Sequence, residues 1–312
     1  MTYPIKITLI VFTLLFFAEM TIAQKDSPII GCWDLEITFE GKKMPSWLEV
    51  RKSGYKTLIG RFVYAFGSAR PIAHVQEKNG TYSFAIPPQW EQGERDMEFE
   101  FKLVGQMLKG KMIYTNGTSH DWVGTRAPLL KRTDTPIWGA PQALFNGKDL
   151  TGWRAMGKNQ WTVENGILTS KMSGSNLVTQ KEFTDFKLHI EFRYPEGSNS
   201  GVYLRGRYEV QIADNAGLEP SDVLFGGVYG FLTPNQMVAK PAGEWQAFDI
   251  TLIGRRVTVV ANGVTIINDQ IIPGITGGAL DSNEGEAGPF FLQGDHGPIE
   301  YRNIVVTPVM KR

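Results

Sequence analysis

Apolar and polar residues alternate one by one along many short segments of this 312-residue chain. Apolar side chains occupy every second position over residues 33–39, 97–103 and 186–192, with polar or charged residues between them. A period of two places the apolar side chains on one face of a half-buried strand. Long segments with the 3.6-residue period of a helix are missing. These patterns predict an all-β protein.

Three Asn-Gly pairs lie between such segments, at residues 79–80, 165–166 and 262–263. Asparagine and glycine both tolerate a positive φ, which the tight turns of β-hairpins require at their two central positions. We therefore expect each pair to connect two antiparallel strands.

Turn-forming residues break the strand pattern near the middle of the chain, at Pro128, Pro136, Gly139 and Pro141. Such a cluster is typical of a connection between domains. It predicts a small β-barrel at 28–130, a linker at 131–141 and a second β domain at 142–312. The recognisable motifs lie in the second half, so we expect independent folding and activity from residues 140–312 alone.

The first domain opens with Gly31-Cys32-Trp33, which resembles the Gly-x-Trp opening of lipocalin and avidin-like (calycin-like) barrels. The resemblance implies an up-and-down barrel, which closes its own edges and suits short strands in meander spacing. The alternative is a tryptophan that simply packs in a small β core.

The N-terminus has the pattern of an export signal. Lys6 precedes an eleven-residue apolar run, Ile7–Phe17, and Thr21-Ile22-Ala23 offers small residues for cleavage. Spanning a bilayer takes ~20 apolar residues, so we expect a signal peptide at 1–23 and no membrane insertion, with a retained anchor as the alternative. Cys32 is the one cysteine, which excludes an internal disulfide and favours the periplasm of a Gram-negative bacterium, or secretion.

The charge balance argues against a nucleic-acid partner. The chain has 32 basic and 32 acidic residues and no basic block. The oligomeric state is not predicted.

Polar residues alternate with apolar ones on two neighbouring segments, 201–205 and 208–212, which Gly206-Arg207 can join in a tight hairpin. The resulting polar face would combine Tyr203, Arg205, Glu209 and Gln211. A carboxylate, an amide, a guanidinium and a phenol can bind sugar hydroxyls. The alternative is a solvated outer face with a cross-strand ion pair.

His296 lies in the loop Gly294-Asp295-His296-Gly297-Pro298, between two apolar segments. A histidine among glycines is poorly placed for core packing and well placed for proton transfer near neutral pH. The alternative is a turn histidine bonded to Asp295. Gln293 precedes this loop. Lys240 lies in a long connection, 213–244, where a lysine is usually solvated.

A series of motifs, in this order, resembles the 3-keto-disaccharide hydrolase domain. The series contains residues 144–153 (LFNGKDLTGW), 199–205 (NSGVYLR), 208–212 (YEVQI), 229–230 (YG), 240–241 (KP), 243–245 (GEW), 262–263 (NG), 291–297 (FLQGDHG) and 301–304 (YRNI). The resemblance implies a concanavalin-like jelly roll of two packed sheets. It also implies cleavage of glycosides already oxidised at C3, and hence an oxidised saccharide as substrate.

The same resemblance suggests roles for eight residues. Glu209 and His296 would be catalytic, and the substrate would be bound by Tyr203, Arg205, Gln211, Tyr229, Lys240 and Gln293. No cofactor or catalytic metal is expected. Asp281, Glu284 and Glu286 could bind a structural Ca²⁺, but scattered loop carboxylates are usually solvated.

Other hydrolytic chemistries fit the sequence less well. It has no Gly-x-Ser-x-Gly elbow, no phosphate loop and no His-Glu-x-x-His motif. Retaining glycosidases need two carboxylates about 5.5 Å apart. Here Gln211 stands two positions after Glu209, and Asp214 would face the other way on a regular strand. Removal of the C2 proton next to a C3 ketone, followed by β-elimination, needs no such pair. A non-catalytic carbohydrate-binding module is the main alternative, and a scaffold protein is a third.

Overall fold

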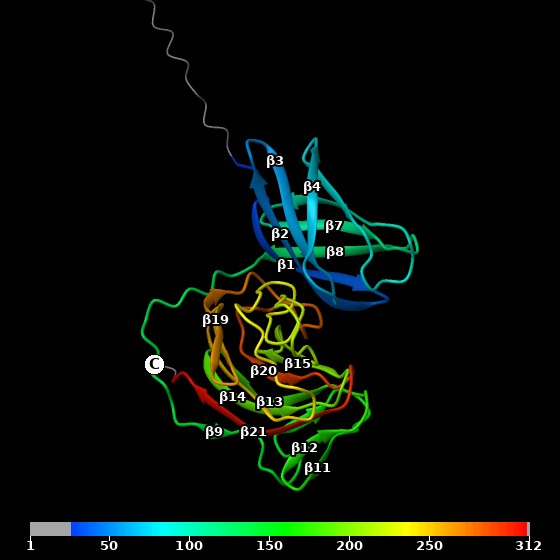
Figure 1. Cartoon of the computed structure of the whole chain (residues 1–312). Coiled ribbons are helices and arrows are strands. Elements are labelled where there is room, and N and C mark those ends of the chain that lie inside the picture. The colour runs from blue at the N-terminus through cyan, green and yellow to red at the C-terminus, as the bar shows by residue number, and fades with distance from the viewer. Residues whose placement is uncertain (1–25, 311–312) are drawn as a thin grey trace, which may run out of the picture.

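The computed structural model describes residues 26–310, and all regular secondary structure in this part is β-strand. Figure 1 shows two bodies, a barrel formed by the first half and a sandwich of two sheets formed by the second. The prediction of an all-β protein is confirmed. The predicted signal peptide, 1–23, lies outside the described residues.

The barrel consists of eight antiparallel strands that pair in sequence order, and β1 closes it by pairing with both β2 and β8. Its strands are β1 (Gly31–Phe39), β2 (Lys42–Ser53), β3 (Thr57–Val63), β4 (Arg70–Lys78), β5 (Thr81–Ile86), β6 (Met97–Val104), β7 (Met107–Ile113) and β8 (Ser119–Arg126). This order confirms an up-and-down barrel. Kinship with lipocalins stays a prediction.

Aromatic side chains fill the barrel interior. Trp33, Trp122 and Phe99 are almost fully buried there, and the Arg126 guanidinium lies 3.8 Å from the centroid of the Trp33 ring. Alternation explains this packing, because Met97, Phe99 and Phe101 of β6 are buried while the residues between them are exposed. The barrel therefore has a packed core of its own.

The sandwich contains a five-stranded sheet and an eight-stranded sheet. The first is ordered β10 (Trp153–Ala155), β13 (Leu177–Phe183), β20 (Gly288–Leu292), β15 (Asn199–Leu204) and β16 (Tyr208–Ala213). The second is ordered β11 (Thr162–Glu164), β12 (Ile167–Ser170), β21 (Ile299–Pro308), β14 (Phe186–Arg193), β17 (Gln246–Ile253), β18 (Arg256–Ala261) and β19 (Val264–Ile271), with β9 (Gln142–Ala143) paired to β21.

All three Asn-Gly pairs form the predicted hairpin turns. They connect β4 to β5, β11 to β12 and β18 to β19, and the three asparagines have φ of 53°, 51° and 51°. Only a residue that tolerates the left-handed region can occupy these positions without strain.

The five-stranded sheet has one apolar face and one polar face. Val202, Val210 and Leu292 point into the core between the two sheets. Their neighbours Tyr203 and Glu209 lie directly opposite each other on β15 and β16, and so share the other face. That other face is turned toward the barrel (Figure 1).

The barrel and the sandwich share a continuous apolar contact. Trp47 and Val63 of the barrel belong to the hydrophobic cluster of the sandwich, and Trp47 packs edge-on against Phe231 with ring centroids 5.1 Å apart. The Ser282 hydroxyl donates a 2.6 Å hydrogen bond to the Leu35 carbonyl across the same boundary. Such an interface resembles the core of one domain more than the polar contact of two independent ones.

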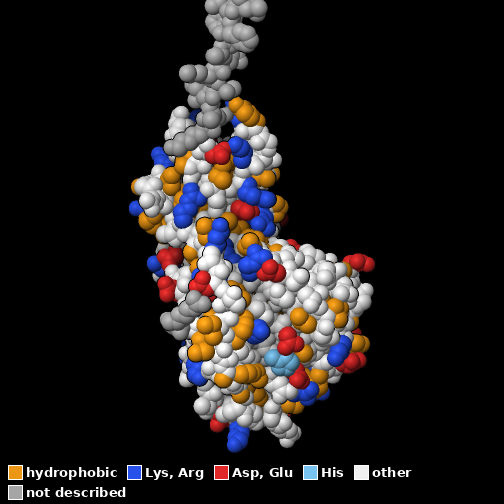
Figure 2. Space-filling view, turned by 90° about the vertical axis from the view of Figure 1, so that its left-hand side faces the viewer, with side chains coloured by type: hydrophobic (Ala, Val, Ile, Leu, Met, Phe, Trp, Pro, Cys, Tyr) orange, Lys and Arg blue, Asp and Glu red, His pale blue; other side chains and the backbone are white. Residues whose placement is uncertain are grey.

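Charged side chains of both signs are interspersed over both bodies on the face drawn in Figure 2, with no large area of a single sign. In the described part of the chain, no helix has the length and hydropathy that crossing a bilayer would require.

Candidate functional site

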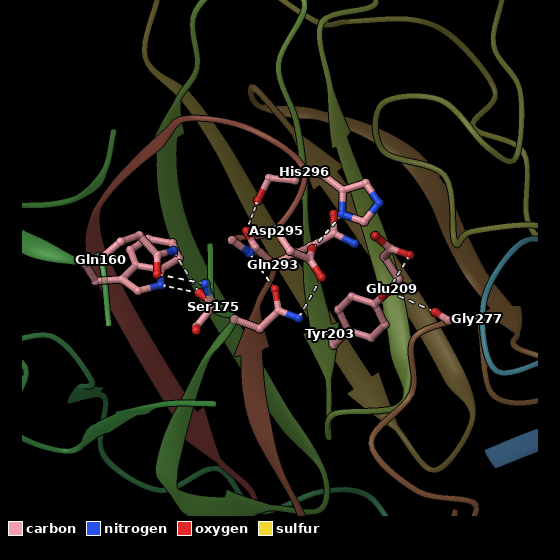
Figure 3. A network of polar contacts seen from close by, with 12 residues as sticks. Gln160, Ser175, Tyr203, Glu209, Gly277, Gln293, Asp295 and His296 are labelled. Atoms are coloured by element: carbon pink, nitrogen blue, oxygen red, sulfur yellow. Dashed lines mark hydrogen bonds and ion pairs between the residues drawn. The ribbon is translucent and has the colours of Figure 1, made fainter. Parts of the chain in front are cut away.

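A cavity of about 590 Å³ lies on the polar face of the five-stranded sheet, beneath two barrel loops. This volume is within the usual range for small-molecule sites. Its lining consists of Phe66, Gly67, Trp90, Asn176, Asn199, Tyr203, Glu209, Gln211, Tyr229, Gly277, Gly278, Phe291, Gln293, Asp295 and His296. Six of the eight predicted site residues therefore meet in this cavity, together with Asp295, and both predicted catalytic groups are among them, as Figure 3 shows for several of these residues.

Glu209 is 4% exposed and projects from β16 into the cavity. Burial raises the pKa of its carboxyl to about 8, because a charged carboxylate loses its hydration there, although the hydrogen bond with Tyr203 acts in the other direction.

The contacts of Tyr203 agree with a protonated Glu209. The Tyr203 hydroxyl oxygen lies 2.9 Å from Glu209 Oε2 and 2.9 Å from the Gly277 carbonyl oxygen. A hydroxyl has one proton, and a carbonyl can only accept. A protonated Glu209 can donate to Tyr203 while Tyr203 donates to Gly277, so both contacts are satisfied at once; an ionised Glu209 would have to share the single Tyr203 proton with the Gly277 carbonyl.

Gly201 makes room for the Glu209 carboxyl. The glycine lies on β15 opposite Gln211, and a Cβ at this position would lie 2.3 Å from Glu209 Oε1. The carboxyl therefore folds over the neighbouring strand into space that any other residue would fill.

His296 and Asp295 form a hydrogen-bonded pair above Glu209 (Figure 3). His296 Nδ1 lies 2.6 Å from Asp295 Oδ1, and Asn176 Nδ2 donates to Asp295 Oδ2 at 3.2 Å. The hydrogen bond to Asp295 raises the pKa of His296 against its partial burial. Burial acts to raise the pKa of Asp295, but the hydrogen bond and charge of His296 outweigh it and lower that pKa. His296 is thus bonded to Asp295, as the alternative interpretation expected, and it also lines the cavity, while its role in proton transfer stays a prediction.

Three amide oxygens in the cavity lining are buried without a hydrogen-bond partner among the described residues. They are Asn199 Oδ1, Gln211 Oε1 and Gln293 Oε1. An unsatisfied buried acceptor costs ~1–3 kcal/mol, so such groups commonly mark a place where a ligand supplies the donor. Three acceptors around one cavity suit a ligand with several hydroxyl groups.

Arg205 does not share this polar face, and the prediction that it does is wrong. The connection between β15 and β16 has three residues, 205–207, and Arg205 begins it with a φ of 53°. This left-handed conformation turns the side chain out of the strand alternation. Its Nη2 donates to the Tyr208 hydroxyl at 3.1 Å and the Gly254 carbonyl at 2.8 Å, and Arg205 is 1% exposed.

Lys240 also lies away from the cavity. Its Nζ donates to the Trp245 carbonyl at 2.9 Å, and the residue is exposed. The solvated alternative for this lysine is therefore correct. Tyr229 does line the cavity, and its backbone N–H donates to the Glu209 carbonyl at 3.0 Å.

Sequence reasoning missed the barrel's part of the site. Phe66, Gly67 and Trp90 line the cavity, so the site is not confined to the second half as we expected. No local pattern could have revealed this, because the contact of Gly67 with Gly277 joins residues far apart in the chain: a Cβ on Gly277 would lie 2.2 Å from the Gly67 carbonyl oxygen. Asn176 had no signal of its own either.

The three loop acids considered for Ca²⁺ include two with arginine partners. Arg207 Nε donates to Asp281 at 2.7 Å, and Arg255 pairs with the fully buried Glu284. Within residues 26–310, no group of three or more His, Cys, Asp or Glu side chains is arranged to hold a metal ion.

The family described as a 3-keto-alpha-glucoside-1,2-lyase-like domain matches residues 140–307. The 3-keto-disaccharide hydrolase of Bacteroides thetaiotaomicron is 32% identical over 93 residues, which cover 25% of this chain and 32% of that protein. The chain thus matches about a third of the length of this curated relative.

Two crystal structures of proteins from Parabacteroides distasonis ATCC 8503, both provisionally named glycosyl hydrolases, are also similar. One is 27% identical with a TM-score of 0.47 over 57% of this chain and 94% of its own, and the other is 25% identical with a TM-score of 0.45 over 55% and 100%. The family match covers more than half of the chain and includes the β15–β16 pair and the His296 loop. The chain belongs to the 3-keto-alpha-glucoside-1,2-lyase-like domain family.

Proposed function

We propose that this protein cleaves the glycosidic bond of 3-keto-glycosides by β-elimination followed by hydration. The observation that carries the proposal is a buried carboxyl with a pKa of about 8 beside a carboxylate-bound histidine in one cavity. Burial keeps a proton on Glu209, and the hydrogen bond to Asp295 orients His296, so the cavity combines a proton donor with an imidazole that can accept a proton.

His296 is the base of this scheme. Asp295 accepts the Nδ1–H bond, which leaves the Nε2 lone pair to remove the proton from C2 of the sugar. The electron pair of that C–H bond moves into the C2–C3 bond, and O3 becomes an enolate oxygen. The negative charge of Asp295 stabilises the imidazolium that forms.

Glu209 is the acid. Its buried carboxyl keeps its proton at neutral pH and gives it to the glycosidic oxygen as the C1–O bond breaks. The enolate then collapses to a C3 ketone with a double bond between C1 and C2. Water adds across this double bond, with hydroxyl at C1 and hydrogen at C2, and yields the free 3-keto-sugar. The sequence of steps is redox-neutral.

The remaining polar groups bind the substrate in this scheme. The Gln293 side-chain amide is the donor for the O3 enolate, because the two predicted cationic contacts, Arg205 and Lys240, lie away from the cavity. The unpartnered oxygens of Asn199 and Gln211 accept bonds from sugar hydroxyls. The rings of Tyr203 and Phe291, stacked 4.2 Å apart, form an apolar part of the floor.

Incubation with 3-keto-trehalose and other 3-keto-glycosides, beside their unoxidised parents, tests the activity. We expect cleavage of the oxidised compounds only. In D₂O, early product should contain deuterium at C2, and a released enone should absorb in the near ultraviolet. Product with only protium at C2, and no detectable enone, would show that the bond is cleaved by direct hydrolysis and not by elimination.

Two observations favour other functions. The unpartnered amide oxygens would equally serve a carbohydrate-binding module, which would bind glycans and leave 3-keto-trehalose intact. The opposite pKa shifts of Glu209 and Asp295 would suit an ordinary glycosidase. However, both Asp295 oxygens already accept hydrogen bonds, from His296 and Asn176, so this carboxylate orients the histidine.

We further propose that residues 1–23 are removed on export and that the enzyme acts in the periplasm or outside the cell. N-terminal sequencing of the mature protein from a fractionated bacterial host tests this. A protein that begins at Gln24 and is found in the periplasmic fraction is the expected result.

A further inference from the structure

The cavity has two chemically different sides. The sandwich supplies all of the carboxyl, imidazole and amide groups together with the rings of Tyr203, Tyr229 and Phe291, whereas the side chains from the barrel are aromatic only, Phe66 and Trp90. These rings, here called the aromatic wall, are 39% and 67% exposed. A tryptophan with that much exposed surface at the mouth of a cavity leaves a large apolar area available for contact.

The wall is held rigidly in place. Arg70 and Glu91 form a buried ion pair with an N–O distance of 2.8 Å, and their side chains are 8% and 1% exposed. Glu91 Oε2 also accepts the backbone N–H groups of Gln89 and Trp90, at 2.7 and 3.1 Å. The loop that carries Trp90 is therefore fixed by its own buried carboxylate, and its rings can bind a ligand with little ordering cost.

The two barrel loops of the wall are also fixed to each other and to the sandwich. The backbone N–H of Ser68 donates to Gln89 Oε1 at 3.0 Å, which joins the Phe66 loop to the Trp90 loop. The backbone N–H of Gly278 donates to the Ala65 carbonyl at 2.8 Å. The position of the wall relative to the catalytic groups is thus set by hydrogen bonds and close backbone packing.

The wall lies on the Glu209 side of the cavity. A Cβ on Gly230 would lie 2.6 Å from the Ala69 backbone nitrogen, so the segment 229–230 packs against the loop that carries Phe66, and the backbone N–H of Tyr229 donates to the Glu209 carbonyl at 3.0 Å. Gln293 and the Asp295–His296 pair come from the other side, next to β13, where Asn176 contacts Asp295. The proposed acid, Glu209, therefore lies on the same side of the cavity as the aromatic wall.

We propose that the barrel forms the leaving-group subsite of the enzyme, in which Phe66 and Trp90 contact the apolar face of a ring-shaped leaving group. This inference rests on the proposed function and assigns the barrel a direct part in substrate choice. An aryl ring and a pyranose ring both present such a face.

The selectivity of the enzyme between leaving groups tests whether the aromatic wall is the leaving-group subsite. The measurement is kcat/KM for phenyl and glucosyl 3-keto-glucosides of both anomers, each divided by the value for the methyl 3-keto-glucoside. Trp90→Ala and Phe66→Ala should lower one or both ratios by about 3- to 10-fold. Trp90→Phe keeps a ring without the N–H group and should retain most of the selectivity. A fall in the phenyl ratio alone assigns an aryl leaving group, and a fall in the glucosyl ratio assigns a sugar.

Tyr55→Ala is the matched control, because Tyr55 is a barrel aromatic that is 76% exposed and lies outside the cavity. It should leave both ratios unchanged. Unchanged ratios in Trp90→Ala and Phe66→Ala, or an equal fall in Tyr55→Ala, would overturn the proposal.

A binding measurement separates this proposal from the proposed function. Titration calorimetry of the full chain with phenyl and methyl glucosides, both with an intact C3 hydroxyl, needs no turnover. We expect wild type to prefer the phenyl compound and Trp90→Ala to lose that preference. If wild type cleaves no 3-keto-glycoside but shows this binding pattern, the aromatic wall is a ring-binding subsite and the proposed reaction is wrong. If wild type does not prefer the phenyl compound, the aromatic wall does not bind a ring-shaped group, whatever reaction the protein catalyses.

Discussion

Replacing Glu209 by glutamine should slow catalysis and stabilise the fold at the same time. The folded protein holds the Glu209 proton up to a pH of about 8, whereas an unfolded chain releases it near 4.5. For a carboxyl whose pKa is higher in the folded than in the unfolded state, the free energy of unfolding is highest below the unfolded-state pKa. It decreases as the pH rises from that value toward the folded-state pKa. At pH 7 the difference corresponds to about 3 kcal/mol of free energy of unfolding.

Glutamine avoids this cost because it is neutral at every pH and can still donate to the Tyr203 hydroxyl. Glu209→Gln should therefore melt about 6–12 °C above wild type at pH 7. Near pH 4 the two proteins should melt together, since Glu209 is then protonated in both the folded and the unfolded state. Turnover should fall by at least ~100-fold, the usual scale for a general acid.

The measurement is thermal unfolding of both proteins from pH 4 to pH 9, followed by circular dichroism. Glu244→Gln changes a solvent-exposed glutamate of the same chain and should not reproduce the pH-dependent gain. Equal melting temperatures at pH 7, or a gain that does not grow with pH, would mean that the Glu209 carboxyl is ionised in the folded cavity. It could then not serve as the acid.

Other predictions follow from the same contacts. His296→Ala should lose at least ~100-fold in turnover on every 3-keto-glycoside. Glu209→Gln should recover most of its activity on a 4-nitrophenyl substrate, because that leaving group departs without an acid. The reverse pattern would show that Glu209 is the base and His296 the acid. The kcat/KM profile of wild type should fall on its alkaline side near pH 8 as Glu209 ionises, and loss of that limb in Glu209→Gln checks the assignment. Gly201→Ala should lower turnover by up to ~100-fold with the fold intact, because its methyl group displaces the Glu209 carboxyl. Burial raises the pKa of Asp34 to about 7 despite the nearby Arg255, so Asp34→Asn should be more stable than wild type at pH 8 and equal to it near pH 4, as urea titrations would show.

The sequence was sufficient for those parts of the site that depend on strand alternation. Tyr203, Glu209 and Gln211 share a face because β15 and β16 pair in register, and both strands show a clear two-residue period. Arg205 obeys the same period in the sequence, but the turn begins at that residue and not one position later. One residue of difference in turn length moved a predicted ligand contact to the opposite face.

The rest of the site depends on contacts between residues that are distant in the chain, which no local pattern encodes. Gly67 and Gly277 illustrate this, because each is ordinary in its own loop and their close approach exists only when the barrel packs on the sandwich. The raised pKa of Glu209 has the same origin. A carboxylate on an open polar sheet face would stay hydrated, and it is enclosure beneath Tyr229, Gly277 and the barrel loops that removes water from it. The barrel loops therefore contribute to the chemistry as well as to the shape of the site: a fragment limited to residues 140–312 would retain every predicted catalytic group but lack these loops, and we expect its Glu209 carboxyl to be more hydrated and to have a lower pKa than in the full chain.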